Sequence, residues 1–285
     1  MRPADPRSLV GTSSAPSTVS WTVDDTILYA IAVGAGRDPR RSELDLTVED
    51  SSAGALRALP SMAAALCLRT PSLLRSLPLG DHPVVHAHQA VELDGPVPPA
   101  GVAVLESSVT AVHDTGRGAI VVTTTTATTP GGDRLFVATS QAYVIGAGGF
   151  GGAPPPRAER AERAPDQEVE MPTWPEQALL YRLTGDRNLL HADPVAARAS
   201  GFPGPILHGL ATLGTATRLL VHELAEGDPR LVRGLGGRFS GTVTPGDRLR
   251  LRIWRNAAGA EFEVLGPDGS PLLKEGDVRL VGHSV

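Results

Sequence analysis

The sequence contains very little cysteine and very little lysine. Cys67 is the only cysteine, which excludes an intrachain disulfide framework and a cysteine-rich metal cluster. Lys274 is the only lysine, so the basic side chains are otherwise arginines. We attribute this bias to codon usage and not to function.

Long apolar runs and an excess of positive charge are also missing. No apolar run reaches the roughly 18 residues that a membrane-spanning helix needs, and the first twenty residues lack the apolar core of a signal peptide. The formal net charge of −5 argues against a protein that binds duplex nucleic acid. We therefore expect a cytoplasmic protein with neither a membrane nor a nucleic-acid partner.

What is present is enough apolar sequence for two domains. The chain has 285 residues, of which 41% are hydrophobic and 20% charged, and domains usually take about 100–200 residues. The run from Gly146 to Glu170 holds glycines, then three prolines, then charged residues, a composition typical of a linker. A phosphate-binding glycine loop is disfavoured because no helix follows it. We place the first domain at residues 1–150, the linker at 151–170 and the second domain at 171–285.

Both domains show the same order of predicted elements. Residues 60–68 and 204–227 have the apolar spacing of buried helices, the second opened by Pro205. Each helix is followed by strand-like runs: 84–93, 101–113, 119–129 and 135–146 in the first domain, and 231–244, 248–255, 260–266 and 271–282 in the second. The chain therefore reads as an α+β unit that occurs twice.

The densest group of polar residues lies between Tyr181 and His191. It contains Asp186, Asn188 and His191, and the glycine before Asp186 favours a turn that lets these side chains converge. An acid and a histidine at one cavity can move protons to and from a substrate. Taken alone, the same pattern also fits a capping aspartate and a structural histidine.

The next segment strengthens the catalytic interpretation. His208 and Gly209 stand at the start of the long apolar helix, where backbone N–H groups have no partner inside the helix and the dipole is positive. A glycine there lets a ligand oxygen approach the backbone. The second domain thus combines an acid–base pair with an oxyanion site.

These motifs resemble one known family. The strings YRLTGDRNLLHADP and PILHGLAT, together with YAIAVGAG around Tyr29, VVHAHQAVEL and GGFGG in the first domain, are similar to the MaoC-like (R)-specific 2-enoyl-CoA hydratases. The resemblance spans nearly the whole chain. It implies two tandem hotdog domains, each a long central helix wrapped by a curved antiparallel sheet.

The resemblance also implies an activity and a set of catalytic residues. The reaction is the reversible syn hydration of a trans-2-enoyl-CoA to a (3R)-3-hydroxyacyl-CoA. Asp186 and His191 would hold the water, Asn188 would orient it, and the Gly209 amide would bind the thioester oxygen. Which member of the Asp–His pair takes the proton is left open.

Further positions follow from the resemblance as substrate contacts. His86 and Ala87 would line an acyl tunnel in the first, non-catalytic domain, and Phe239 would pack against the CoA moiety. Arg238 is a candidate phosphate partner, although it reads equally well as a solvated side chain. Relatives often carry a lysine at Thr115, and Arg117 is the candidate to supply that charge, with the same alternative.

Two departures from the family pattern and two alternative functions accompany this reading. Leu189 replaces the usual proline after Asn188, and His88 stands where relatives often have an acid.

The alternatives are a dehydratase of a 3-hydroxyacyl or branched thioester, and a non-catalytic acyl-thioester binding module. We expect no metal, no cofactor and a homodimer.

Overall fold

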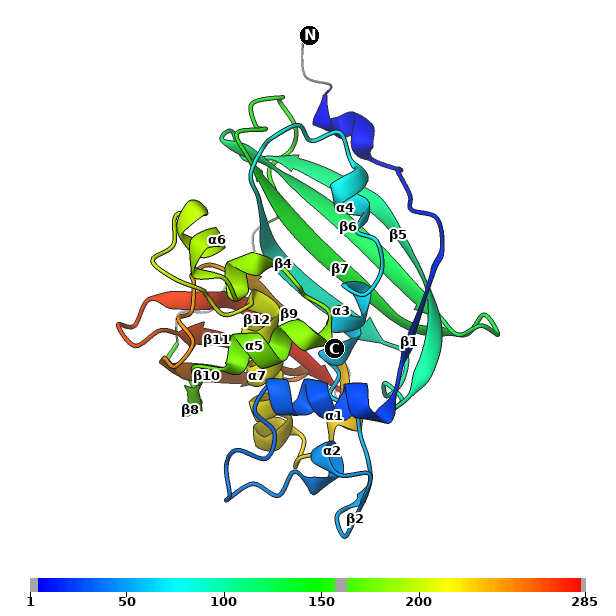
Figure 1. Cartoon of the computed structure of the whole chain (residues 1–285), viewed down its shortest axis with the longest axis vertical. Helices are drawn as coiled ribbons and strands as arrows, with labels where there is room; N and C mark the ends of the chain where they lie inside the picture. Colours follow the sequence, from blue (N-terminus) through cyan, green and yellow to red (C-terminus); the bar gives the residue numbers. More distant parts are fainter. Residues whose placement is uncertain (1–4, 157–162, 283–285) are drawn as a thin grey trace.

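The computed structural model describes residues 5–156 and 163–282. Ten strands form one antiparallel sheet in the order β1-β5-β6-β7-β4-β9-β12-β11-β10-β8, and a separate small hairpin pairs β2 with β3. Figure 1 shows the sheet with helices packed against it in both halves. Among the described residues, no helix is both long enough and apolar enough to cross a membrane.

The N-terminal half supplies the first five strands of this order. Its elements are η1 Pro6–Leu9, β1 Ser17–Trp21, α1 Val23–Ala32, α2 Leu44–Thr47, β2 Asp50–Ser51, β3 Gly54–Ala55, α3 Met62–Cys67, α4 Leu73–Ser76, β4 Val84–Leu93, β5 Gly101–Asp114, β6 Gly118–Thr128 and β7 Arg134–Ile145.

The C-terminal half supplies the other five strands. Its elements are β8 Gln167–Pro172, α5 Gln177–Tyr181, η2 Arg182–Thr184, η3 Leu189–His191, α6 Pro194–Ala199, α7 Gly209–Leu224, η4 Pro229–Leu231, β9 Val232–Phe239, β10 Arg248–Asn256, β11 Gly259–Leu265 and β12 Pro271–Leu280.

The two halves repeat one topology. Each begins with a strand, continues through helices, and ends with four strands that pair in the same pattern, so β1, β4, β5, β6 and β7 correspond to β8, β9, β10, β11 and β12. The halves join where β4 and β9 run antiparallel, with Val91 opposite Leu235. The expected α+β architecture of two hotdog units is confirmed.

The central helices differ between the two halves, contrary to the long helix expected in each. Helix α7 has 16 residues, whereas α3 has only six. Pro71 follows soon after the end of α3, and the residue before a proline is disfavoured in the helical conformation. The N-terminal sheet is therefore covered by several short helices and not by one long one.

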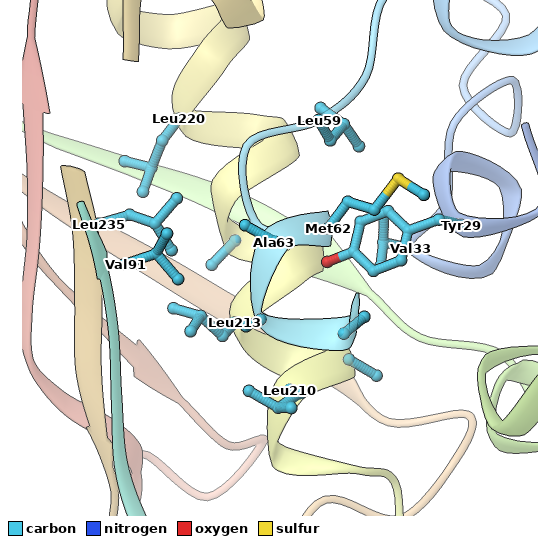
Figure 2. Close-up of a cluster of buried hydrophobic side chains, with 14 of the residues drawn as sticks. Tyr29, Val33, Leu59, Met62, Ala63, Val91, Leu210, Leu213, Leu220 and Leu235 are labelled. Carbon is cyan, nitrogen blue, oxygen red and sulfur yellow. The ribbon is translucent and has the colours of Figure 1, made fainter. Parts of the chain in front are cut away.

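Helices α3 and α7 pack together over the β4–β9 junction. Figure 2 shows Val91 and Leu235 on one side of α7, with Tyr29 and Val33 of α1 beyond α3. Gly214 of α7 makes the α1 contact possible, because a Cβ there would lie 2.7 Å from Val33 Cγ1 and 2.8 Å from the Tyr29 hydroxyl. A second, smaller cluster around Leu73, Val109, Val121 and Val144 lies under η1 and α4.

Residues 167–170, which we assigned to the linker, belong to strand β8. Val169 pairs with Leu251 of β10, and Glu168 and Glu170 form ion pairs with Arg252 and Arg248 on that strand. The alternation of acidic and apolar residues is that of an edge strand with one buried face. The charged composition is what makes it resemble a linker.

The glycine-rich run before the linker is also held in place. The Asp114 carboxylate accepts hydrogen bonds from the backbone N–H groups of Gly116, Gly149 and Gly151. These bonds lower the pKa of Asp114 to about 2. The run is therefore fastened to the end of β5.

Candidate active site

The turn that carries Asp186 lies between η2 and η3 and is held from the other half of the molecule. Gly185 has a φ of +148°, a value that favours glycine, and a Cβ there would meet the carbonyl oxygen of Ala65 at 3.3 Å. Arg69, just beyond α3, donates to the Thr184 carbonyl oxygen at 3.0 Å and to Asp25 at 2.7 Å. The N-terminal half thus fixes the turn that carries Asp186.

His191 is held in one orientation and one tautomer. Its Nδ1 lies 2.8 Å from the carbonyl oxygen of Ile206, and because a carbonyl oxygen only accepts, Nδ1 carries the proton. Nε2 is then left as an acceptor. The residue is only 9% exposed, so this free nitrogen is largely shielded from solvent.

His208, the residue before α7, stacks on His191. The two ring centroids are 3.7 Å apart with 25° between the planes, and His208 Nε2 donates to the backbone carbonyl oxygen of Asp186 at 3.3 Å. Burial and the nearby His191 lower the pKa of His208 to about 3, so its ring is uncharged at neutral pH. Its Nδ1 is buried without a hydrogen-bond partner among the described residues.

Asp186, His191 and His208 therefore form one cluster, in which their potential ligand atoms all lie within 4.8 Å of one another. A metal ion would need lone pairs that converge on one point, and the lone pairs of an imidazole lie in the plane of its ring. The stacked, nearly parallel rings of His191 and His208 do not point their lone pairs at a common position. The geometry suits proton transfer better than metal binding.

Gly209 and Phe239 form the adjoining wall. Gly209 is the first residue of α7, so its N–H has no acceptor within the helix. A Cβ on Gly209 would come within 3.0 Å of the Phe239 ring, which explains the need for glycine there. Phe239, at the end of β9, closes one side of this helix terminus.

His86 reaches the same place from β4. Its ring meets Phe239 edge to face at 5.0 Å, and its Nε2 lies 3.1 Å from both the His88 carbonyl oxygen and Ser140 Oγ. Burial lowers the pKa of His86 to about 4, while the nearby Asp186 charge acts in the opposite direction. The two halves therefore meet at one site.

Ala87 shapes this part of the strand. The register of β4 against β7 shifts between His86 and His88, so Ala87 sits in a β-bulge, a device that re-aims neighbouring side chains. Because of this bulge, His86 lies on the inner face of the sheet together with Gln89 and Val91, and His88 does not.

The remaining predicted residues lie outside the cluster. Asn188 is exposed, and its Oδ1 accepts from the Leu190 N–H, which caps η3. Arg238 neighbours Phe239 in β9 and so faces the opposite side of the sheet, where it pairs with Glu275 at 2.9 Å. Thr115 and Arg117 are exposed in the β5–β6 turn, where Thr115 Oγ1 bonds to Gly118.

The site also contains residues that the motifs did not single out. The sequence puts His208 at the helix start but assigns it no role, although its position beside Gly209 is a usable signal. Arg69 carries no sequence signal, because it acts on a turn 115 residues further along the chain.

Comparisons with known proteins identify the family of the chain. Residues 19–146 match the MFE-2 hydratase 2 N-terminal domain, and residues 157–265 match the MaoC like domain. An enoyl-CoA hydratase of Mycobacterium tuberculosis is 38% identical over 98% of this chain and 99% of its own. A 3-hydroxyacyl-thioester dehydratase of the same organism is 39% identical over 97% of this chain and 98% of its own.

Similarity to a solved structure extends over the whole fold. The MaoC-like dehydratase from Phytophthora capsici superimposes with a TM-score of 0.84 and 27% identity, covering 97% of both chains. The chain therefore belongs to the MaoC-like hydratase and dehydratase family, with the N-terminal domain of the MFE-2 hydratase 2 type.

Proposed function

We propose that this protein is a lyase that reversibly hydrates trans-2-enoyl-CoA to (3R)-3-hydroxyacyl-CoA. Full-length similarity to an enoyl-CoA hydratase supports the reaction class. The observation that carries the proposal is the cluster of Asp186, His191 and the N-terminus of α7, since it combines an acid–base pair with a donor for an oxyanion.

In the proposed mechanism, His191 both takes and returns the proton. A water molecule held between Asp186 and His191 attacks the β-carbon while one of its protons passes to His191 Nε2, the nitrogen left free by the Ile206 contact. The resulting thioester enolate then takes that proton at the α-carbon, which restores neutral His191. Asp186, as carboxylate, accepts a hydrogen bond from the other O–H. The hydroxyl group and the proton of one water are added to the same face of the double bond. His191 and Asp186 return to their starting protonation states.

Gly209 supplies the electrostatic part of this mechanism. Negative charge develops on the thioester oxygen as the water attacks, and a backbone N–H at a helix N-terminus stabilises such charge. The Phe239 ring packs against the same helix terminus. Removing one donor of this type typically lowers kcat by about 10²–10³-fold.

Other predicted residues are assigned to the rest of the substrate according to where they lie in the fold. His86 lies next to Phe239, and Ala87 occupies the adjacent β-bulge. The acyl thioester enters the proposed site here. Asn188 acts through the shape of the η3 turn that presents His191. Thr115, Arg117 and Arg238 remain candidates for the CoA phosphates, and Arg238 would first have to leave Glu275.

The same site catalyses dehydration of 3-hydroxyacyl thioesters, because the reaction is reversible. The similarity to a 3-hydroxyacyl-thioester dehydratase favours including this direction. Comparing initial rates with enoyl and 3-hydroxyacyl thioesters, each on CoA and on carrier protein, identifies the preferred carrier and direction.

The assembly and location are further parts of the proposal. We propose a homodimer in the cytoplasm, to be tested by light scattering of the purified protein and by fractionation of the source cells. The exposed Leu179, Leu189 and Val195 around the catalytic turn provide apolar surface that a partner copy would cover.

The central experiment measures hydration of crotonyl-CoA through the loss of enoyl-thioester absorbance, followed by assignment of the product's configuration. Asp186→Asn and His191→Ala should each lose about 10²–10⁴-fold in kcat. Asp81→Asn and His82→Ala, exposed residues of the same types, serve as matched controls with parental activity. An (S)-configured product, or near-parental rates in both active-site variants, would contradict the proposal.

A further inference from the structure

The inner face of the N-terminal sheet is interrupted by a band of polar side chains. We define the polar band as Gln89 of β4, Ser140 of β7, Thr123 and Thr125 of β6 and Ser107 of β5. Paired positions connect them, with Gln89 opposite Ser140, Ser140 opposite Thr123, and Thr125 opposite Ser107. The band therefore crosses four adjacent strands.

Apolar residues border the polar band on both sides. On the same face of these strands, Leu105, Ala127 and Ala138 belong to the main core, and Val109, Val121 and Val144 belong to the smaller cluster. All six are at most 3% exposed, whereas Ser107, Thr123, Thr125 and Ser140 are only partly buried. The four hydroxyl-bearing side chains thus occupy a part of the face that the hydrophobic clusters leave uncovered.

The corresponding face of the C-terminal sheet has no comparable band among its described residues. There the inner positions of β10 and β11 are Leu249, Leu251, Ile253, Phe262 and Val264, all buried in the same core cluster as residues of α7. The difference matches the lengths of the central helices, because α7 covers its sheet and the six-residue α3 covers only part of its own.

The polar band begins at the catalytic cluster. Ser140 Oγ lies 3.1 Å from His86 Nε2, and the His86 ring contacts Phe239 beside Gly209. From β4 to β6 the distance across the sheet is roughly 10 Å, given a spacing of about 4.8 Å between strands. A medium-length acyl tail that leaves the reacting carbons along this face would reach Thr123 and Thr125.

We infer that Thr123 and Thr125 determine acyl specificity and that the site prefers acyl groups with an oxygen-bearing tail over plain alkyl chains. A threonine hydroxyl offers one donor and two acceptor lone pairs. Thr125 Oγ1 shares a bond of 2.7 Å with Ser107 Oγ, and Thr123 Oγ1 donates to the Ser140 carbonyl oxygen at 3.5 Å. Each bond uses only part of the capacity of its hydroxyl. An alkyl tail would cover these hydroxyls without replacing their contacts with water, which costs free energy. A tail hydroxyl or carbonyl replaces those contacts.

The test rests on the proposed hydratase function and uses the run of four threonines as its own control. Side chains alternate faces along a strand, so Thr123 and Thr125 point inward and Thr124 and Thr126 outward. The measured quantity is the ratio of kcat/KM for 8-hydroxy-trans-2-octenoyl-CoA to that for trans-2-octenoyl-CoA. We expect the parent protein to favour the hydroxylated substrate. Thr123→Val or Thr125→Val should lower the ratio about 2–10-fold, and Thr124→Val or Thr126→Val should leave it unchanged.

A second measurement separates this inference from the hydratase function. Calorimetric binding of octanoyl-CoA and 8-hydroxyoctanoyl-CoA needs no turnover, and the ratio of their Kd values should change in the same two variants only. If the protein did not hydrate enoyl-CoA but still bound the two ligands with different Kd values, the hydratase function would be refuted and the inferred acyl specificity would stand. A parent that prefers the alkyl chain, or inner and outer variants with equal ratios, would overturn the inference.

Discussion

At the scale of single residues, the site depends on a histidine that does not itself need to react. His208 stacks on His191 and donates to the backbone of Asp186, so one ring touches both members of the pair. Its lowered pKa keeps it neutral, so in the proposed mechanism no second positive charge lies next to His191 when that ring takes up a proton.

This arrangement predicts different effects for two substitutions of His208. Glutamine places an amide near the position of Nε2 and can keep the bond to the Asp186 carbonyl, whereas asparagine places it near Nδ1 and cannot. We expect kcat of His208→Asn to fall about 2–10-fold below that of His208→Gln, the range of one hydrogen bond, with similar KM. Steady-state kinetics on crotonyl-CoA provide the measurement, and equal kcat values would show that the bond does not position Asp186.

At the scale of elements, local patterns predict the strands well and the contacts between distant segments poorly. Strand β4 is predicted with its observed bounds, because Val and Leu alternate with polar residues between turns. Strand β8 is not predicted, because its glutamates look like linker residues until they are paired with the arginines of β10, about 80 residues away in the sequence. The stacking of His208 on His191 likewise depends on where α7 begins relative to the turn that carries Asp186, which local pattern does not encode.

The packing of α1 against α7 gives a prediction at this scale. Alanine normally stabilises a helix relative to glycine by up to about 1 kcal/mol, but a Cβ at Gly214 would lie 2.7 Å from Val33 Cγ1. We expect Gly214→Ala to lower the free energy of unfolding by about 1–3 kcal/mol through overpacking. Urea denaturation measures this change.

Gly95→Ala is the matched control, because a Cβ there meets no atom within 4 Å. Its unfolding free energy should stay within about 0.5 kcal/mol of the parent value. If Gly214→Ala were instead more stable than the parent, α1 would have to move away from α7 at little cost.

At the scale of the whole molecule, a buried ionic network fastens the N-terminal half to α7. The Glu43 side chain is fully buried and receives hydrogen bonds at 2.7 Å from Arg218 and from His222 Nε2, and at 2.7 Å from the Gly36 N–H. Arg218 also donates to the Val33 carbonyl oxygen. This network holds the segment after α1 against the helix whose other end carries Gly209.

The network makes the stability of the protein depend on pH. Burial alone would raise the pKa of Glu43, but the hydrogen bonds from His222 and Arg218 outweigh burial and lower it below the usual 4.5. A carboxyl with a lowered folded-state pKa stabilises the fold above its unfolded-state pKa, and this contribution is lost as the pH falls through the folded-state value. The loss is therefore expected below about pH 4.5.

Replacing Glu43 by glutamine should remove this pH dependence along with the charge. Because Arg218 would then be buried without its counter-ion, Glu43→Gln should lower the free energy of unfolding at pH 7 by about 3–5 kcal/mol. The difference from the parent should shrink as the pH falls below about 4.5, whereas Glu106→Gln, an exposed residue of β5, should follow the parent throughout. Urea titrations at several pH values between 7 and about 3 measure both effects, and a constant difference down to the lowest pH would mean that the network contributes through packing and not through the charge of Glu43.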